Sequence, residues 1–271
     1  YFQANDGTNG VELWRINTSG FAEMVEDNIP GGGINPFGAN AYPTNLTNVG
    51  GTLYFSAVSF LSGRELWRIN ALGIAEIVED AVPGGGIRAG SSSSYPANLT
   101  NVNGTLYFAA HGGANIGNEL WRINTAGVAV LVEDSVPGGG IQPGYASSNP
   151  ANLTDVGGTL FFSADDGTRG IELWRINSGG TAEIVEDIIP GGGIAPGNGS
   201  ASPAQLTNMN GTLYFAAVEP TNGLELWRVG GSGIAQLVED AVPGGGISPE
   251  FASSSPVKLT NSNGVLYFQA N

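Results

Sequence analysis

The sequence predicts an all-β fold, a five-bladed β-propeller with four antiparallel strands in each blade. Two observations predict it. A unit of about 53 residues repeats five times along the 271 residues, and glycine interrupts every window that could hold a helix. The chain's five tryptophans mark the repeat, each within Glu-Leu-Trp-Arg: Trp14, Trp67, Trp121, Trp174 and Trp227.

One repeat, taken at 149–200, shows the strands that we expect in every blade. Segments 149–156 and 159–166 are short runs of β-forming residues, the second ending on a turn dipeptide. Segments 171–177 and 181–187 alternate by side, as strands with two different faces do. A single four-stranded sheet cannot bury both faces, so the blades must stack. We expect the tryptophans and the Leu-Tyr-Phe segments to fill the space between blades.

The two chain ends predict how the ring closes. The chain begins with strands three and four of a blade (12–27) and ends with strands one and two (257–270). Pairing these ends would complete the fifth blade and leave only protected edges. The segment Tyr-Phe-Gln-Ala-Asn, however, occurs at both 1–5 and 267–271, and one ring has a single place for it. Three readings stay open: a displaced N-terminal copy, which is the default, a cut from a longer array, or pairing with a neighbouring molecule.

Composition limits the classes of function. The net charge is −15 and only 12% of residues are charged, which disfavours nucleic acid and anionic membranes as partners, because both need clusters of Lys and Arg. Glycine and proline are abundant at 44 and 15 residues, but 41% of residues are hydrophobic and can build a core. There is no cysteine, and no apolar run reaches membrane-spanning length. We therefore expect a single repeat domain over 1–271, part of a longer chain, without membrane insertion.

The repeat also resembles a known family. Segments 6–17 ("DGTNGVELWRIN") and 166–177 ("DGTRGIELWRIN"), with 98–110 ("NLTNVNGTLYFAA"), are similar to the bacterial repeat proteins named for Glu-Leu-Trp-x-x-Asp-Gly-Thr. The Asp-Gly-Thr after the tryptophan is replaced in all five units, for example by Asn17-Thr18-Ser19. The resemblance implies an extracellular or cell-surface bacterial protein and carries no established chemistry.

An acidic, glycine-rich phrase recurs once in each unit, at 25–34, 78–87, 132–141, 185–194 and 238–247. Its prolines predict type II turns: Pro30, Pro83, Pro137, Pro190 and Pro243. A glycine nest for an anion is the alternative, which the preceding Glu-Asp pair disfavours. We expect one carboxylate of each pair to cap backbone N–H groups in the turn. A weak surface Ca²⁺ site is the alternative, although the spacing of a calcium loop is absent.

No catalytic residue or cofactor is expected. His111 is the only histidine and lies in a turn of one unit, so no Ser-His-Asp set can be assembled in the others. A catalytic site would also have to break the repeat strongly. We therefore predict a protein that is not an enzyme and holds no structural metal.

The units differ mainly in two loops, where binding would be located. One is the long connection after the glycines, and the other joins strands two and three. Aromatic residues in four long connections suit a sugar ring, with anchoring of the loops as the alternative: Tyr42, Tyr95, Tyr145 and Phe251. Two functions follow. The first is an extracellular structural or interaction scaffold that associates with itself or with filament neighbours, and the second is a multivalent lectin that binds glycans.

Overall fold

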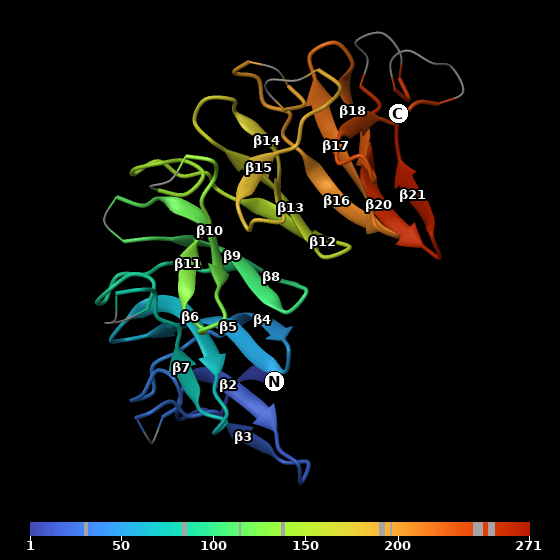
Figure 1. Cartoon of the computed structure of the whole chain (residues 1–271). Coiled ribbons are helices and arrows are strands. Elements are labelled where there is room, and N and C mark those ends of the chain that lie inside the picture. Colours follow the sequence, from blue (N-terminus) through green and yellow to red (C-terminus); the bar gives the residue numbers. More distant parts are fainter. Residues whose placement is uncertain are drawn as a thin grey trace. The chain divides into compact units, whose positions relative to one another are not determined.

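The computed structural model describes residues 1–29, 32–82, 86–113, 115–136, 139–189, 193–195, 197–240, 246–248 and 253–271. All regular elements within those ranges are β-strands (Figure 1), which confirms the predicted all-β class. In the same ranges, no helix has the length and apolarity needed to cross a membrane. The chain divides into two compact units, 1–131 and 132–271. The prolines of the predicted type II turns, and Phe251, lie outside the described residues.

The first unit contains one three-stranded and two four-stranded antiparallel sheets. The three-stranded sheet is β1 (Phe2–Asn5), β2 (Val11–Ile16) and β3 (Ala22–Met24). The next is β4 (Thr44–Val49), β5 (Thr52–Ser59), β6 (Gly63–Ile69) and β7 (Ala75–Ile77). The last is β8 (Ala97–Val102), β9 (Thr105–His111), β10 (Asn118–Ile123) and β11 (Ala129–Leu131).

The second unit contains two four-stranded sheets and one two-stranded sheet. The first sheet is β12 (Ala151–Val156), β13 (Thr159–Asp165), β14 (Ile171–Ile176) and β15 (Ala182–Ile184). The second is β16 (Ala204–Met209), β17 (Thr212–Glu219), β18 (Gly223–Val229) and β19 (Ala235–Leu237). The two-stranded sheet is β20 (Val257–Ser262) and β21 (Val265–Gln269).

These sheets confirm the four predicted strands of the repeat and correct the length of the fourth. The segment predicted as a strand over 181–187 forms a ladder only over Ala182–Ile184. The chain then leaves the sheet, because the Glu186 carbonyl accepts a hydrogen bond from Ala235 N of the following repeat (2.9 Å). Equivalent bonds join Ala75 N to Glu26 O and Ala129 N to Glu79 O. The end of one repeat is thus fastened to the fourth strand of the next.

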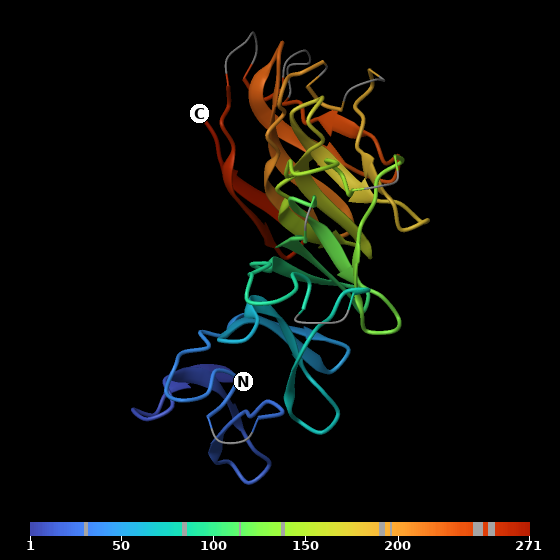
Figure 2. The same ribbon diagram turned by 90° about the vertical axis from the view of Figure 1, so that its left-hand side faces the viewer.

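Within each unit, neighbouring sheets follow one another in chain order (Figures 1 and 2). In the first unit, Phe55 and Trp67 pack with Leu13 and Val25 of the preceding repeat in one buried cluster. The four internal phenylalanines at this position are fully buried: Phe55, Phe108, Phe162 and Phe215. The predicted packing of tryptophan and phenylalanine between sheets is therefore confirmed. It resembles the stacking of propeller blades.

The predicted closure of a ring by the two chain ends is not confirmed, and neither is the count of five blades. The N-terminal copy of Tyr-Phe-Gln-Ala-Asn is not displaced, so the default reading of this segment is wrong. It forms β1 and pairs with β2 in the register of a second strand, with Phe2 opposite Trp14 as Phe55 lies opposite Trp67. The C-terminal copy belongs to the two-stranded sheet of β20 and β21.

Candidate binding pockets between adjacent repeats

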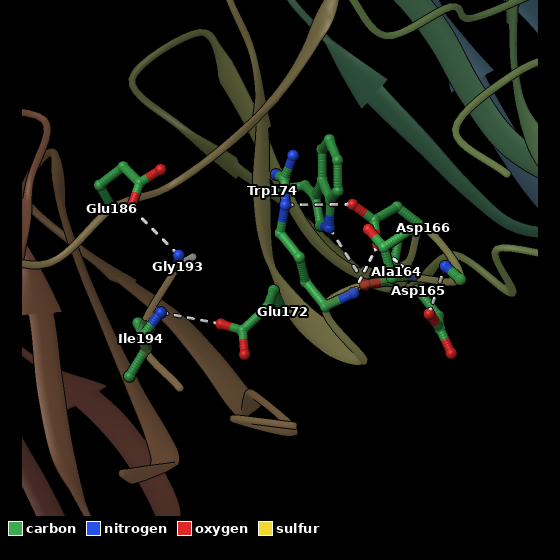
Figure 3. Close-up of polar contacts among 11 residues, drawn as sticks. Ala164, Asp165, Asp166, Glu172, Trp174, Glu186, Gly193 and Ile194 are labelled. Atoms are coloured by element: carbon green, nitrogen blue, oxygen red, sulfur yellow. Dashed lines mark hydrogen bonds and ion pairs between the residues drawn. The ribbon is translucent and has the colours of Figure 1, made fainter. Parts of the chain in front are cut away.

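The glutamate of the Glu-Leu-Trp segment fixes the long connection of its own repeat, as the contacts of Glu12, Glu65, Glu172 and Glu225 show. Glu172 on β14 is fully buried, and its carboxylate accepts hydrogen bonds from Ile194 N (2.9 Å, Figure 3) and Ala201 N (3.0 Å). The same pattern recurs at Glu12 with Ile34 N and Ala41 N, at Glu65 with Ile87 N and Ser94 N, and at Glu225 with Ile247 N and Ser254 N. The partners of these glutamates are backbone N–H groups, joined at Glu65 and Glu225 by the hydroxyls of Ser94 and Ser254.

This buried carboxylate also accounts for the last glycine of the recurrent phrase. Gly193 has a positive φ of 84°, and a Cβ on it would lie 2.6 Å from Glu172 Oε2. A side chain would therefore be strained in its backbone and would collide with the glutamate. The phrase keeps glycine here because the connection passes directly over the carboxylate.

Burial has the largest effect on the pKa of three of these glutamates. It raises the pKa of Glu12, Glu65 and Glu172 to about 7, even though the backbone N–H donors act in the opposite direction. Removing a carboxylate from water disfavours its charged form, and hydrogen bonds to that form recover only part of the cost. These three side chains titrate close to neutral pH while remaining structural.

One carboxylate of each Glu-Asp pair was predicted to cap the turn that follows it, and at Glu186 and Asp187 both do. Glu186 Oε2 accepts from Gly193 N at 3.0 Å (Figure 3), and Asp187 Oδ1 accepts from Ile189 N at 2.6 Å. Both carboxylates of the pair therefore serve the backbone. Over the described residues, no three His, Asp or Glu side chains are placed to hold a metal ion. Weak Ca²⁺ binding stays a prediction.

Two pockets in the second unit occupy the same place in successive repeats. One has a volume of about 490 Å³ beside Trp174, and the other about 330 Å³ beside Trp227. Most of their lining residues correspond at an interval of 53: Asp134 and Asp187, Ser135 and Ile188, Arg169 and Asn222, Trp174 and Trp227, Ala182 and Ala235, Glu183 and Gln236, Ile184 and Leu237, Glu186 and Glu239. Each pocket thus lies between the end of one repeat and the sheet of the next.

The chemistry of the two pockets differs where the repeat varies. Beside Trp174, Arg169 lies 3.5 Å from Asp166 and Arg175 forms an ion pair with Glu183 at 2.6 Å. Beside Trp227, the corresponding residues are the neutral Asn222 and Gln236. Carboxylates of Asp187, Glu219 and Glu239 remain in the Trp227 pocket, and no Lys or Arg is among its described lining residues. That pocket therefore suits a neutral ligand that donates hydrogen bonds.

In three of the repeats, the arginine after the tryptophan joins strands three and four by an ion pair and also contacts the next repeat. Arg175 Nε pairs with Glu183 Oε1, and Arg175 Nη1 donates to Gly233 O at 3.0 Å. Asn177 Nδ2 donates to the second oxygen of Glu183 at 3.2 Å. Arg15 and Arg68 make the same contacts with Glu23 and Glu76. The arginine of these three repeats thus pairs across strands three and four.

The loop aromatics predicted to bind sugar do not form one repeated set. Tyr42 and Tyr95 occupy equivalent positions, whereas Tyr145 falls elsewhere in its connection. All three side chains are exposed, and none lines the pockets described above. A role for these residues in binding stays a prediction.

The pocket residues were missed by sequence reasoning, although a signal was present. The loop between strands two and three was recognised as variable, and in the fifth unit it supplies Glu219, Thr221 and Asn222 to the Trp227 pocket. Asp187 belongs to the preceding repeat. Asp187 reaches the Trp227 pocket because successive repeats pack against each other, and the spacing of residues along the sequence does not predict that contact.

Comparisons with known proteins identify no family for the chain and one solved structure of low similarity. No family model matches the chain, and no curated protein matches it. The crystal structure of the BP39L lectin from Burkholderia pseudomallei is similar, with a TM-score of 0.39 and 12% sequence identity. The match covers 90% of this chain and 69% of that chain. A likeness of this size establishes neither the fold nor a ligand for the present chain. Its all-β class follows from the antiparallel sheets of its own structure.

Proposed function

We propose that the chain is a non-enzymatic binding module that presents equivalent pockets in successive repeats and takes neutral carbohydrate. The observation that carries the proposal is the recurrence of one pocket, built from corresponding residues, beside Trp174 and Trp227. Repetition of weak sites gives a protein avidity for a ligand that is itself repeated, such as a glycan. The extracellular or cell-surface setting expected from the family resemblance is where such ligands occur.

The character of the Trp227 pocket favours a sugar over other ligands. Its carboxylates repel anions, and its amides and hydroxyl can exchange hydrogen bonds with a ligand hydroxyl. Ile188 and Ile189, which are exposed at its edge, offer an apolar surface to the C–H groups of a sugar ring. Ligand sites generally combine such apolar walls with a few polar groups.

The acidic residues support a non-enzymatic role, because they form hydrogen bonds with the backbone. The buried glutamates accept hydrogen bonds from the backbone of their connections, and the Glu-Asp pairs cap turns. His111 is half-buried, and its Nδ1 lies 3.2 Å from the carbonyl of Gly112. These groups therefore have structural partners, and a general acid and base have to be free to exchange protons with a substrate.

Calorimetric titration with the methyl glycosides of glucose, galactose and mannose tests the proposal. Saturable binding of at least one glycoside, with more than one site per chain, is the expected result. A matched pair of variants locates it: Asp187→Asn, in the Trp227 pocket, should weaken binding, and Asp6→Asn, on an exposed turn, should not. Absence of binding for all three glycosides would reject the proposed function.

An interaction scaffold is the second candidate, and exposed loops of the first unit favour it. Phe37 is 91% exposed and Phe60 is 69% exposed. Their loops are joined by a hydrogen bond from Phe60 N to Asn35 Oδ1 at 3.0 Å. Large exposed aromatics mark surfaces that contact other proteins. If the scaffold role holds, light scattering will show assemblies that Phe37→Ser with Phe60→Ser dissolves and that sugars leave unchanged.

A further inference from the structure

The Trp227 pocket contains negative charge that no cation of its described lining compensates. Asp187, Glu219 and Glu239 line it, and no Lys or Arg is among its described lining residues. Asp187 belongs to the end of one repeat, and Glu219 is the last residue of β17 in the next. Acids from two successive repeats therefore meet in one pocket.

Asp187 and Glu219 are close enough to repel each other. Burial raises the pKa of the Asp187 carboxyl above its ordinary value, and the negative charge of Glu219 raises it further. Asp187 is only 9% exposed, so water screens this repulsion less than it would on an open surface. A positive charge bound between the two side chains would relieve the repulsion.

Each of these two carboxylates uses one oxygen for the fold. Asp187 Oδ1 accepts from Ile189 N at 2.6 Å. Glu219 Oε2 accepts from Asn222 N at 3.1 Å, from Asn222 Nδ2 at 2.7 Å and from the hydroxyl of Thr221. Among the described residues, no donor is bonded to Asp187 Oδ2 or Glu219 Oε1. These two oxygens are available to a ligand in the pocket.

The repeat of Trp174 shows the same position with a cation of its own. Asp166 corresponds to Glu219 at the interval of 53 residues. Arg169, which lines the Trp174 pocket, lies 3.5 Å from the Asp166 carboxylate. The residue that corresponds to Arg169 beside Trp227 is the neutral Asn222. The fifth repeat thus keeps the acid of the hairpin and lacks the cation that accompanies it in the fourth.

We propose that the Trp227 pocket prefers a carbohydrate that carries a protonated amino group, so that the ligand supplies the cation that Arg169 supplies in the preceding repeat. The inference rests on the proposed function and adds to it the substrate class of one pocket. Neutral sugars remain ligands of both pockets, because a hydroxyl also donates to a carboxylate. An ammonium group has three donors and a charge, so it binds the same oxygens more strongly than a hydroxyl does.

An amino sugar fits this pocket better than a bare cation does. Over the described residues, no three His, Asp or Glu side chains are placed to hold a metal ion. The pocket has a volume of about 330 Å³, within the range of sites for small organic ligands. Ile188 and Ile189 at its edge are exposed and can contact the C–H groups of a sugar ring. A sugar with an amine therefore uses both the carboxylates and the apolar wall.

Calorimetric titration with three methyl glycosides tests the preference, at a pH at which the sugar amine is protonated. The probes are the methyl glycosides of glucosamine, of N-acetylglucosamine and of glucose. The glucosamine glycoside should bind one site per chain about fivefold more tightly than the glucose glycoside, because a hydrogen bond to a charged donor is stronger than one to a neutral donor. The neutral N-acetyl derivative should lose this advantage, and high salt should reduce it. A glucosamine glycoside that binds no more tightly than the glucose glycoside would overturn the inference.

Two variants locate the preference in the Trp227 pocket. Glu219→Gln removes a charge and keeps an acceptor, and Asn222→Arg introduces the cation that the fourth repeat has at Arg169. Both should abolish the advantage of the glucosamine glycoside, and Glu219→Gln should still bind the glucose glycoside. Asp6→Asn, on an exposed turn, is the control that should keep the advantage, and melting temperatures show whether each variant folds. An unchanged advantage in both folded variants would place the site elsewhere and overturn the inference.

The outcomes separate failure of this inference from failure of the proposed function. If the glucose glycoside binds and the glucosamine glycoside gains nothing, the inference fails and the binding function stands. If none of the sugars binds, both fail. Ethanolamine, which carries an amine without a sugar ring, is the last probe. If it binds as tightly as the glucosamine glycoside, the pocket selects cations and not amino sugars, and the inference is wrong.

Discussion

The buried glutamate of the Glu-Leu-Trp segment is a single residue on which a whole connection depends. Its two oxygens accept hydrogen bonds from backbone groups that are 22 and 29 residues away along the chain. A carboxylate is suited to this task because it is an acceptor at both oxygens. The repeat therefore keeps a charged residue in a place from which water is excluded.

Glu172→Gln should lower the free energy of unfolding by about 1–3 kcal/mol, since the amide offers one acceptor and turns a donor toward a backbone N–H. Urea denaturation measures the loss. Glu183→Gln is the matched control, because the Glu183 side chain is 37% exposed and its ion pair is worth little. Equal losses in the two variants would contradict the role assigned to Glu172.

Tyr95 has a backbone conformation that an aromatic residue rarely adopts. Its φ is +50°, and Asn149 has φ +47° at the equivalent position of the next repeat. Asparagine tolerates this left-handed region, whereas other side chains are strained there. The tyrosine is also exposed, so little packing offsets the strain.

Tyr95→Asn should therefore raise the free energy of unfolding by about 0.5–1 kcal/mol, which thermal denaturation can detect. Tyr145→Asn is the control, because Tyr145 is exposed without a positive φ. A loss of stability in Tyr95→Asn would show that the tyrosine packs in solution, as a loop anchor would.

At the scale of elements, strands three and four are joined by an ion pair that only some repeats contain. Arg68 pairs with Glu76 at 2.6 Å, and these residues are also partners in the strand register. In the third repeat the register partner of Arg122 is Val130, and in the fifth the partner of Arg228 is Gln236. The position opposite Arg122 is therefore a site where a carboxylate can be introduced to test the ion pair.

Val130→Glu should place a carboxylate opposite Arg122 and stabilise the protein by about 0.2–1 kcal/mol, the range of partly exposed ion pairs. The gain should shrink in high salt, because screening weakens such pairs. Val130→Gln is the neutral control. A gain of the same size in the glutamine variant would assign the effect to packing or to hydrogen bonding.

The elements of the fold could be predicted from the sequence better than the contacts between them. Alternation and turn residues located the strands over 149–177 to within a few residues. The fourth strand was predicted too long: Val185 N still donates to Leu173 O of the same sheet, but the carbonyl of Glu186 accepts from Ala235 N of the next repeat. That the buried indole N–H of Trp227 has no acceptor among the described residues was beyond prediction, because Glu-Leu-Trp-Arg is identical in all five units and only the paired hairpin differs.

At the scale of the whole molecule, several buried acids make stability depend on pH. Glu12, Glu65 and Glu172 have pKa values raised from 4.5 to about 7 by burial. The folded state therefore binds more protons than the unfolded state between about pH 4.5 and 7. Their stabilising contribution is complete below that window and is lost as the pH rises through it. The net charge of −15 also destabilises the folded state through repulsion between carboxylates, and this repulsion grows as the pH rises.

The melting temperature should consequently rise when the pH falls from about 8 to about 5. Further acidification should reverse the gain. Hydrogen bonds from Asn17 and Asn70, followed by the ion pairs with Arg15 and Arg68, lower the pKa of Glu23 and Glu76, and these contacts are lost on protonation. Calorimetric scans across this range provide the check. A melting temperature that increases steadily from pH 5 to pH 8 would contradict these pKa directions.

The central claim is that contacts between successive repeats create the binding positions, and a crystal structure with a bound methyl glycoside tests it most directly. The account predicts a sugar in the pocket beside Trp227, in contact with Asp187, and another in the corresponding pocket beside Trp174. A sugar stacked on Tyr42, Tyr95 or Tyr145, with both tryptophan positions empty, would contradict it.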